Sequence, residues 1–155
     1  MKADGPYIFE DVKDELSTDF KRESELCNFI EDNIQIFCLE ELGVIYASHK
    51  REHPVVKSRK RIKGLRRLDF LIKTRAGENI GLECKVPLYP SELPAGIGQI
   101  LSYKMLMDLA GTPINRFVLV SSKMDVVAPM MIQEFRLPIE FIAMDKKKSL
   151  TWQGR

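Results

Sequence analysis

This 155-residue sequence contains no long apolar run, no apolar signal-peptide core and no closely spaced cysteine pair. No apolar run approaches the roughly 20 residues that a membrane-spanning helix needs, and the first residues contain no apolar core of a signal peptide. The three cysteines, Cys27, Cys38 and Cys84, are widely spaced and form no C-x-x-C pair. This spacing disfavours a zinc ribbon or a disulfide framework. We therefore expect an intracellular protein of the cytoplasm, or of the host cytoplasm if the source is viral, with no membrane contact.

Histidine is also scarce. With two histidines and no motif around either of them, the sequence offers no Cys-His or Ser-His catalytic arrangement. Apolar residues are plentiful at 45% of the chain, which is enough for a sizeable core, and the length fits one domain. We expect an irregular polar segment over residues 1–18, a single domain over 19–145 and a polar tail over 146–155.

The net charge of +2 conceals one strongly basic segment. Residues 50–67 hold nine of the 24 Lys and Arg residues but one of the 22 acidic residues, so the rest of the chain is acidic overall. Dense positive charge of this kind is typical of polyanion binding, above all of contacts with nucleic-acid phosphates. A solvated loop or a protected sheet edge is the alternative. The residues predicted to bind nucleic acid are Lys57, Arg59, Lys60, Arg61, Lys63, Arg66 and Arg67.

Apolar periodicity predicts alternating helices and strands. An apolar face from Leu26 to Phe37, with residues three and four apart, predicts a helix over 20–42 with Gly43 as its stop. Two strand-like runs joined by a short stretch containing Gly77 predict an antiparallel hairpin. In chain order the other predicted elements are a short strand at 43–47, the hairpin strands at 67–73 and 79–86, a loop at 86–98, a helix at 99–111, a strand at 115–122, a helix at 125–136 and a strand at 139–145. This order predicts an α/β fold with a mixed sheet flanked by helices.

The hairpin carries charged residues inside its apolar strands: Asp69 in RLDFLIK, and Glu83 and Lys85 in NIGLECKV. If the turn centres near Ala76, Asp69 and Glu83 lie opposite each other, and Lys85 shares the face of Glu83. Facing like charges destabilise a sheet, and a hard divalent cation such as Mg²⁺ would offset that cost. Two acids, a metal ion and a lysine can together hydrolyse a phosphodiester. A solvent-facing sheet surface with scattered charges is the alternative.

The segments RLDFLI and GLECKV, followed by a helix that opens GQILSYK, resemble the core of the PD-(D/E)XK nuclease superfamily. The likeness points to its Holliday-junction resolvase, RecB-like and archaeal structure-specific endonuclease branches. It implies a restriction-endonuclease-like mixed sheet, with metal ligands at Asp69, Glu83 and the main-chain carbonyl of Cys84. Lys85 would be the catalytic lysine. Leu68 stands where the family name has proline, a departure that the family tolerates.

Two helices complete the site that the resemblance implies. On the helix after the hairpin, Gln99 matches a glutamine of those branches, and Tyr103 lies one turn further along the same face, where it would contact DNA. On the first helix, Glu23 or Glu25 would supply a further catalytic acid, and we expect Glu23. An ordinary solvent-facing glutamate is the alternative for either residue.

These features together predict a Mg²⁺-dependent deoxyribonuclease, an endonuclease that hydrolyses phosphodiester bonds in DNA. Mn²⁺ is expected to substitute for Mg²⁺. The preferred DNA structure or sequence is left open, and so is the choice between a monomer and a homodimer. Two rival functions also stay open: a nucleic-acid-binding module of the same fold without turnover, and an interaction protein whose sheet merely carries charges.

Overall fold

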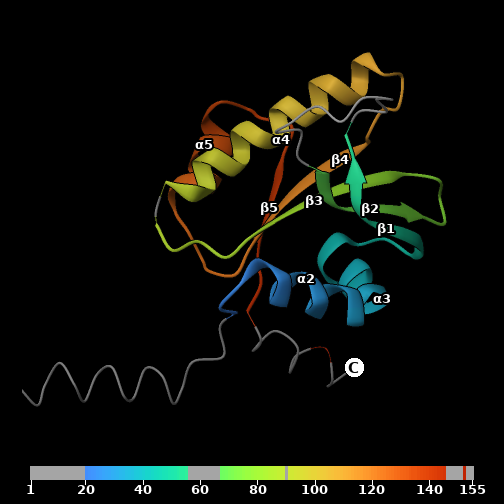
Figure 1. Ribbon diagram of the computed structural model, residues 1–155, viewed down its shortest axis with the longest axis horizontal. Helices are drawn as coiled ribbons and strands as arrows, with labels where there is room; N and C mark the ends of the chain where they lie inside the picture. Colours follow the sequence, from blue (N-terminus) through green and yellow to red (C-terminus); the bar gives the residue numbers. More distant parts are fainter. Residues whose placement is uncertain (1–19, 56–66, 90, 146–151, 153–155) are drawn as a thin grey trace, which may run out of the picture.

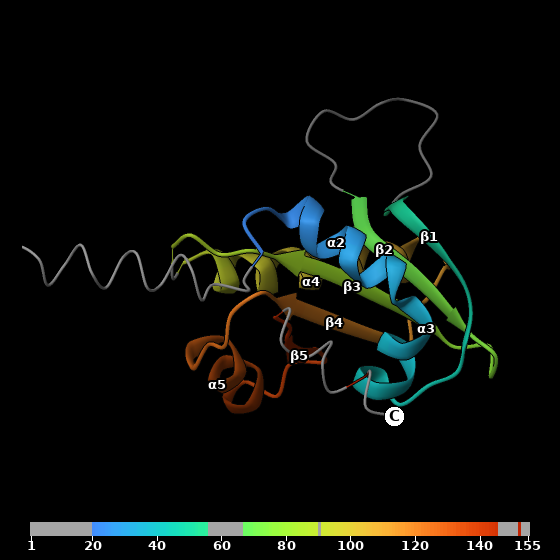
Figure 2. The same cartoon turned by 90° about the horizontal axis from the view of Figure 1, so that it is seen from below.

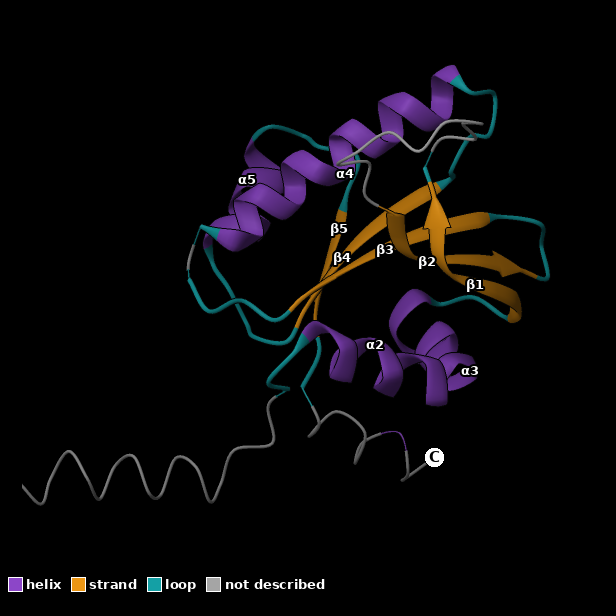
Figure 3. Ribbon diagram, in the orientation of Figure 1, coloured by secondary structure: helices purple, strands orange, loops and turns teal. Residues whose placement is uncertain are grey.

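A computed structural model of the protein describes residues 20–55, 67–89, 91–145 and 152. The elements in chain order are α2 (Glu23–Asp32), α3 (Ile34–Phe37), the π-helical turn η1 (Cys38–Leu42), β1 (Tyr46–Pro54), β2 (Arg67–Thr74), β3 (Asn79–Lys85), α4 (Glu92–Leu109), β4 (Arg116–Ser121), α5 (Val127–Glu134) and β5 (Glu140–Ala143). Five strands form one sheet in the order β1-β2-β3-β4-β5, with α2 and α3 on one face and α4 and α5 on the other (Figures 1 and 3). The predicted α/β fold, a mixed sheet flanked by helices, is confirmed.

The charged hairpin forms in the predicted register. β2 and β3 run antiparallel, and their ladder extends from the pair Phe70–Leu82 to the pair Lys73–Asn79. The turn between them contains Gly77 at φ +88°, a left-handed conformation that glycine adopts without strain. β1 pairs antiparallel with β2, whereas β4 pairs in parallel with both β3 and β5. β3 is therefore the central strand, and the sheet is mixed as predicted.

The helix predicted over 20–42 is wrong in one respect, because Asn33 interrupts it between α2 and α3. The Asn33 side chain donates to the Phe29 carbonyl at 2.8 Å, in competition with the main chain for a helix acceptor. The predicted apolar face is nevertheless buried, and Gly43 ends the helical region at φ +68°. Figure 2 shows α2 lying across the face of the sheet. The apolar pattern thus predicts which face of the helix is buried. It does not predict an interruption of the helix at Asn33, because the interruption leaves that face buried.

The loop predicted over 86–98 is wrong for its second half, because α4 begins at Glu92. Pro94 lies in the first turn of that helix, where its missing N–H has no intrahelical partner in any case. The Glu92 carboxylate accepts the main-chain N–H groups of Leu88 and Tyr89, which fixes the start of the helix. A proline that looks like a breaker in the sequence thus belongs to a helix start.

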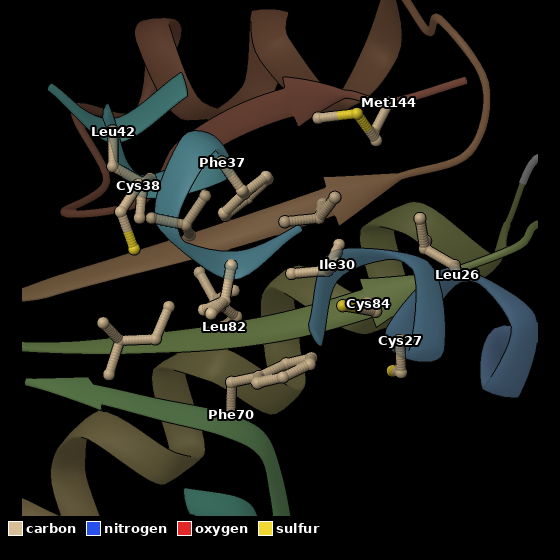
Figure 4. Close-up of a cluster of buried hydrophobic side chains, with 14 of the residues drawn as sticks. Leu26, Cys27, Ile30, Phe37, Cys38, Leu42, Phe70, Leu82, Cys84 and Met144 are labelled. Carbon is tan, nitrogen blue, oxygen red and sulfur yellow. The ribbon is translucent and has the colours of Figure 1, made fainter. Parts of the chain in front are cut away.

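Each face of the sheet carries its own apolar core. The core under α2 contains Leu26, Cys27, Ile30, Phe37, Phe70, Leu82, Cys84 and Val120 (Figure 4), and the core under α4 contains Leu68, Leu93, Ile97, Ile100, Tyr103, Phe117 and Leu119. Trp152 is buried against the first core and stacks on Phe29, with 5.9 Å between the ring centroids. The predicted polar tail therefore contains one core residue, since a tryptophan gains much from burial. Every helix that the structure describes is too short or too polar to span a membrane.

Candidate metal centre

Asp69 and Glu83 lie where the hairpin ladder ends. The last main-chain pair is Phe70–Leu82, and the two acids are the next residues on their strands. Just beyond this pair, the Asp69 carboxylate accepts the Cys84 N–H, with 2.7 Å between Oδ2 and N. A side-chain oxygen thus takes the place of the strand carbonyl that a continued antiparallel ladder would supply. The structure brings together the two acids that the sequence paired.

The Glu83 carboxyl group is buried, with 4% of the residue exposed. Its Oε1 atom has no hydrogen-bond partner among the described residues, a costly state for a buried polar atom. Burial raises the pKa of Glu83 to about 9, helped by the charge of Asp69 and the hydrogen bond with it. Glu83 is therefore protonated at neutral pH. The repulsion expected between two facing carboxylates is thus avoided by a proton on one of them.

Lys85 ends β3 and lies against α4. A Cβ atom at Gly96 would stand 3.4 Å from Lys85 Cε and 3.2 Å from Leu119 Cδ1, so the glycine leaves room for the lysine chain. The Lys85 ammonium group lies 3.6 Å from Glu23 Oε1, and the lysine side chain is mostly buried. Lys85 therefore presents its charge at the end of the sheet, between the start of α2 and α4.

The structure separates the two acids considered on the first helix. Glu25 Oε2 accepts the main-chain N–H groups of Lys21 and Arg22, at 2.8 and 3.2 Å. It therefore satisfies donors at the start of α2, a helix-capping role. Glu23 instead pairs with Lys85. Of the two glutamates, Glu23 is the one placed beside the lysine of the hairpin.

Gln99 and Tyr103 lie one turn apart on α4, as predicted. The Gln99 amide nitrogen stands 3.5 Å from the Tyr103 hydroxyl oxygen, at the outer limit of a hydrogen bond. Gln99 is half-buried, whereas Tyr103 is 5% exposed and belongs to the core under α4. The ring of Tyr103 packs inside the protein, and the DNA contact predicted at this residue stays a prediction. The apolar body of tyrosine explains this burial, since it gains from packing under the helix.

A polar network that the sequence analysis missed ties α2 to β1. The His49 ring bridges the Tyr46 hydroxyl and the Glu31 carboxylate, at 2.7 Å on each side, and Arg51 Nη1 lies 3.0 Å from Glu31 Oε1. The hydrogen bond with His49 is the main cause that lowers the pKa of Glu31. The partners are far apart in the sequence, so no local pattern signals the network. It fixes the helix whose first turn holds Glu23.

The basic segment is only partly described. Lys57, Arg59, Lys60, Arg61, Lys63 and Arg66 lie outside the described residues. Arg67 is exposed at the start of β2, two residues before Asp69. β1 extends into this segment as far as Pro54, beyond the strand predicted at 43–47. Of the basic residues predicted to bind nucleic acid, Arg67 is therefore the one whose exposure the structure describes.

No family model matches the chain, and no curated protein matches it in sequence. Among solved structures, it is similar to a repair endonuclease from Pyrococcus abyssi, with 20% identity and a TM-score of 0.51. That match covers 84% of this chain and 50% of the other. A structure described as an EndoMS–dsDNA2 complex matches with 17% identity and a TM-score of 0.48, over 80% of this chain and 45% of that one. The chain thus spans about half the length of these proteins, and the first likeness shows a shared fold.

Proposed function

We propose that this protein is a divalent-metal-dependent endonuclease acting on DNA. The observation that carries the proposal is the acid pair of half-buried Asp69 and buried Glu83, with the Lys85 ammonium at the same end of the sheet. Two acids and a lysine placed in this way match the residues that the resemblance to the PD-(D/E)XK superfamily implies. The shared fold with a repair endonuclease supports the proposal, because that protein is named for the same class of reaction.

The residues present fit a hard divalent cation such as Mg²⁺. Glu83 has a buried oxygen, Oε1, with no hydrogen-bond partner among the described residues, and burial keeps its carboxyl group protonated. A cation can replace that proton, because Mg²⁺ prefers oxygen ligands and binds carboxylates in their charged form. Asp69, Glu83 and the carbonyl of Cys84 would hold the ion. When bound, the ion would polarise a phosphodiester and lower the pKa of a water molecule.

The other residues have separate tasks around the acid pair. Lys85 is placed to stabilise the negative charge that develops on a phosphate during hydrolysis. Glu23 orients the lysine through their ion pair at 3.6 Å. Gln99, half-buried on α4, contributes a neutral hydrogen-bonding group on the same side of the sheet as Glu83. Arg67 would bind the backbone of DNA from its exposed position, and such contacts give affinity without sequence specificity. We therefore expect recognition of DNA shape rather than of a fixed sequence.

Cleavage of labelled DNA tests the proposal. Plasmid, linear duplex and branched substrates are incubated with the protein in Mg²⁺, in Mn²⁺ and in a chelator. We expect metal-dependent cleavage that is lost in Glu83→Gln and kept in Glu78→Gln, a matched change of an acid in the hairpin turn. A shift in gel mobility without cleavage, under every metal condition, would identify a binding module instead. If the protein neither binds nor cleaves DNA, both functions are contradicted.

A further inference from the structure

Asp69, one member of the acid pair, also lies close to two buried cysteines from two other elements. Cys27 lies on α2, Asp69 on β2 and Cys84 on β3, and one ligand atom of each lies within 4.8 Å of the other two. Cys27 is 4% exposed and Cys84 fully buried. Figure 4 shows Cys27 on α2 and Cys84 on β3 close to each other. Interaction with the Cys27 thiol, together with burial, raises the pKa of Cys84 well above its usual value.

This combination is unusual for an apolar core. A buried cysteine without a ligand normally behaves as a small apolar side chain, and a carboxylate is a poor neighbour for such a group. Thiolates and a carboxylate are, however, common ligands of zinc. We infer that Cys27, Cys84 and Asp69 form a second metal site, which takes a soft divalent cation such as Zn²⁺. None of its side chains except Asp69 belongs to the proposed nuclease centre.

The distances suit this assignment. Zinc binds sulfur at about 2.3 Å and carboxylate oxygen at about 2.0–2.2 Å, so tetrahedral ligand atoms lie roughly 3.5–3.8 Å apart. Atoms that already lie within 4.8 Å of one another need to approach by at most about 1.3 Å, which side-chain rotations supply. Two sulfur ligands favour Zn²⁺ over Mg²⁺, because a hard ion prefers oxygen.

Asp69 stands between the two sets of ligands. Along β3 the side chains alternate, so Leu82 and Cys84 enter the core under α2 while Glu83 points to the opposite face. Asp69 reaches both sides, since it contacts Glu83 and also lies within the thiol cluster. A soft ion on the α2 side would therefore draw on the same carboxylate that a hard ion on the α4 side needs. Zinc and magnesium would compete for Asp69.

Cobalt spectroscopy tests the site without any use of nuclease activity. The reduced, metal-free protein is titrated with Co²⁺, which occupies zinc sites and shows an ultraviolet charge-transfer band when thiolates bind it. We expect this band at one equivalent, with visible absorption typical of tetrahedral cobalt, and its loss when Zn²⁺ is added. The double variant Cys27→Ala/Cys84→Ala should lose the band altogether, and each single variant should keep a weaker one. Asp69→Asn should keep the band but bind cobalt less tightly.

Cys38 provides the matched control. It is a third buried cysteine, on η1, where burial raises the pKa of its thiol to about 11, and it does not belong to the cluster. Cys38→Ala should leave the cobalt band unchanged. Circular dichroism checks that each variant is folded. A folded wild-type protein that binds cobalt without a thiolate band, or does not bind it, would overturn the inference whatever the variants do.

A second measurement, which rests on the proposed nuclease function, tests the competition for Asp69. Zn²⁺ should inhibit Mg²⁺-dependent cleavage by the wild-type protein, and each variant is compared with itself in the absence of zinc. We expect the inhibition to be weaker in Cys27→Ala and unchanged in Cys38→Ala. Equal inhibition of the two variants would refute a shared Asp69. If the wild-type protein cleaves no DNA, the nuclease proposal fails while the cobalt spectra still decide on the thiol site.

Discussion

Replacement of Glu83 by glutamine should remove a pH dependence from the stability of the metal-free protein. Burial is the main cause that raises the pKa of Glu83, to about 9, whereas an unfolded glutamate titrates near 4.5. Between these two values the folded protein holds a proton that the unfolded chain releases. Stability must therefore fall as the pH rises through this window, and it is fully present only below the lower value.

The size of the effect follows from the same shift. One proton bound in the folded state alone costs roughly 1 kcal/mol of stability for each pH unit within the window. From pH 5 to pH 8 the wild-type protein should thus lose on the order of a few kcal/mol through this group. Glu83→Gln keeps the shape of the side chain and never ionises. The variant should match the wild type near pH 5 and exceed it near pH 8.

Urea unfolding in a chelator, at pH values from 5 to 8.5, measures both curves. Glu78→Gln serves as a control for the loss of one acid on the same hairpin, and it should follow the wild type. Addition of Mg²⁺ at pH 8 should stabilise the wild type, because the ion binds the folded state alone, and should stabilise Glu83→Gln far less. Parallel curves for wild type and Glu83→Gln across the whole range would refute a buried, protonated Glu83. Equal stabilisation of both proteins by Mg²⁺ would refute the metal centre.

Three further predictions address the neighbours of the acid pair. Lys85→Ala should lower the cleavage rate by about 100-fold, the scale of one preorganised charge, while calorimetry still detects Mg²⁺ binding; near-normal cleavage would exclude the lysine from the reaction. Gly96→Ala should slow cleavage, because the added Cβ would stand 3.4 Å from Lys85 Cε and displace the lysine chain, whereas the gain of about 1 kcal/mol from alanine in a helix opposes the cost of crowding in thermal unfolding; an unaltered cleavage rate would contradict the close packing. Replacement of Arg59, Lys60 and Arg61 by alanine should reduce the slope of log K against log salt by about 2.7, at roughly 0.9 for each phosphate contact; an unchanged slope would mean that these residues do not contact DNA.

Much of the fold can be predicted from the sequence, because it depends on local patterns such as turn residues and apolar periodicity. The hairpin register follows from the position of the turn at Gly77, and that register places Asp69 beside Glu83. The interruption of the first helix and the start of α4 were harder to predict. Asn33 interrupts a helix without disturbing its apolar face, and Pro94 resembles a breaker although it occupies the first turn of α4. Asn33 bonds a helix carbonyl through its side chain, and Pro94 lies where a helix needs no N–H donor; apolar periodicity detects neither effect.

Long-range neighbours are beyond a single sequence. Nothing near Cys27 indicates that it meets Cys84, and nothing near His49 indicates that Glu31 binds it. The burial of Tyr103 was also missed, because an apolar face and a functional face of α4 share the same helical spacing. Tertiary packing decides such cases, and the sequence contains the residues but not their contacts.

Hydrogen exchange and the NMR shift of the Cys84 amide report on the Asp69 carboxylate directly, which no enzymatic assay does. Amide protons on the central strand of a sheet exchange with solvent only when a large part of the protein opens. The Cys84 N–H donates to the Asp69 carboxylate, with 2.7 Å between N and Oδ2, rather than to a main-chain carbonyl. An ion that pulls the Asp69 carboxylate away from this amide would change its exchange rate and its NMR shift. This one amide can therefore report which metal engages Asp69, at a single residue and in the absence of any DNA.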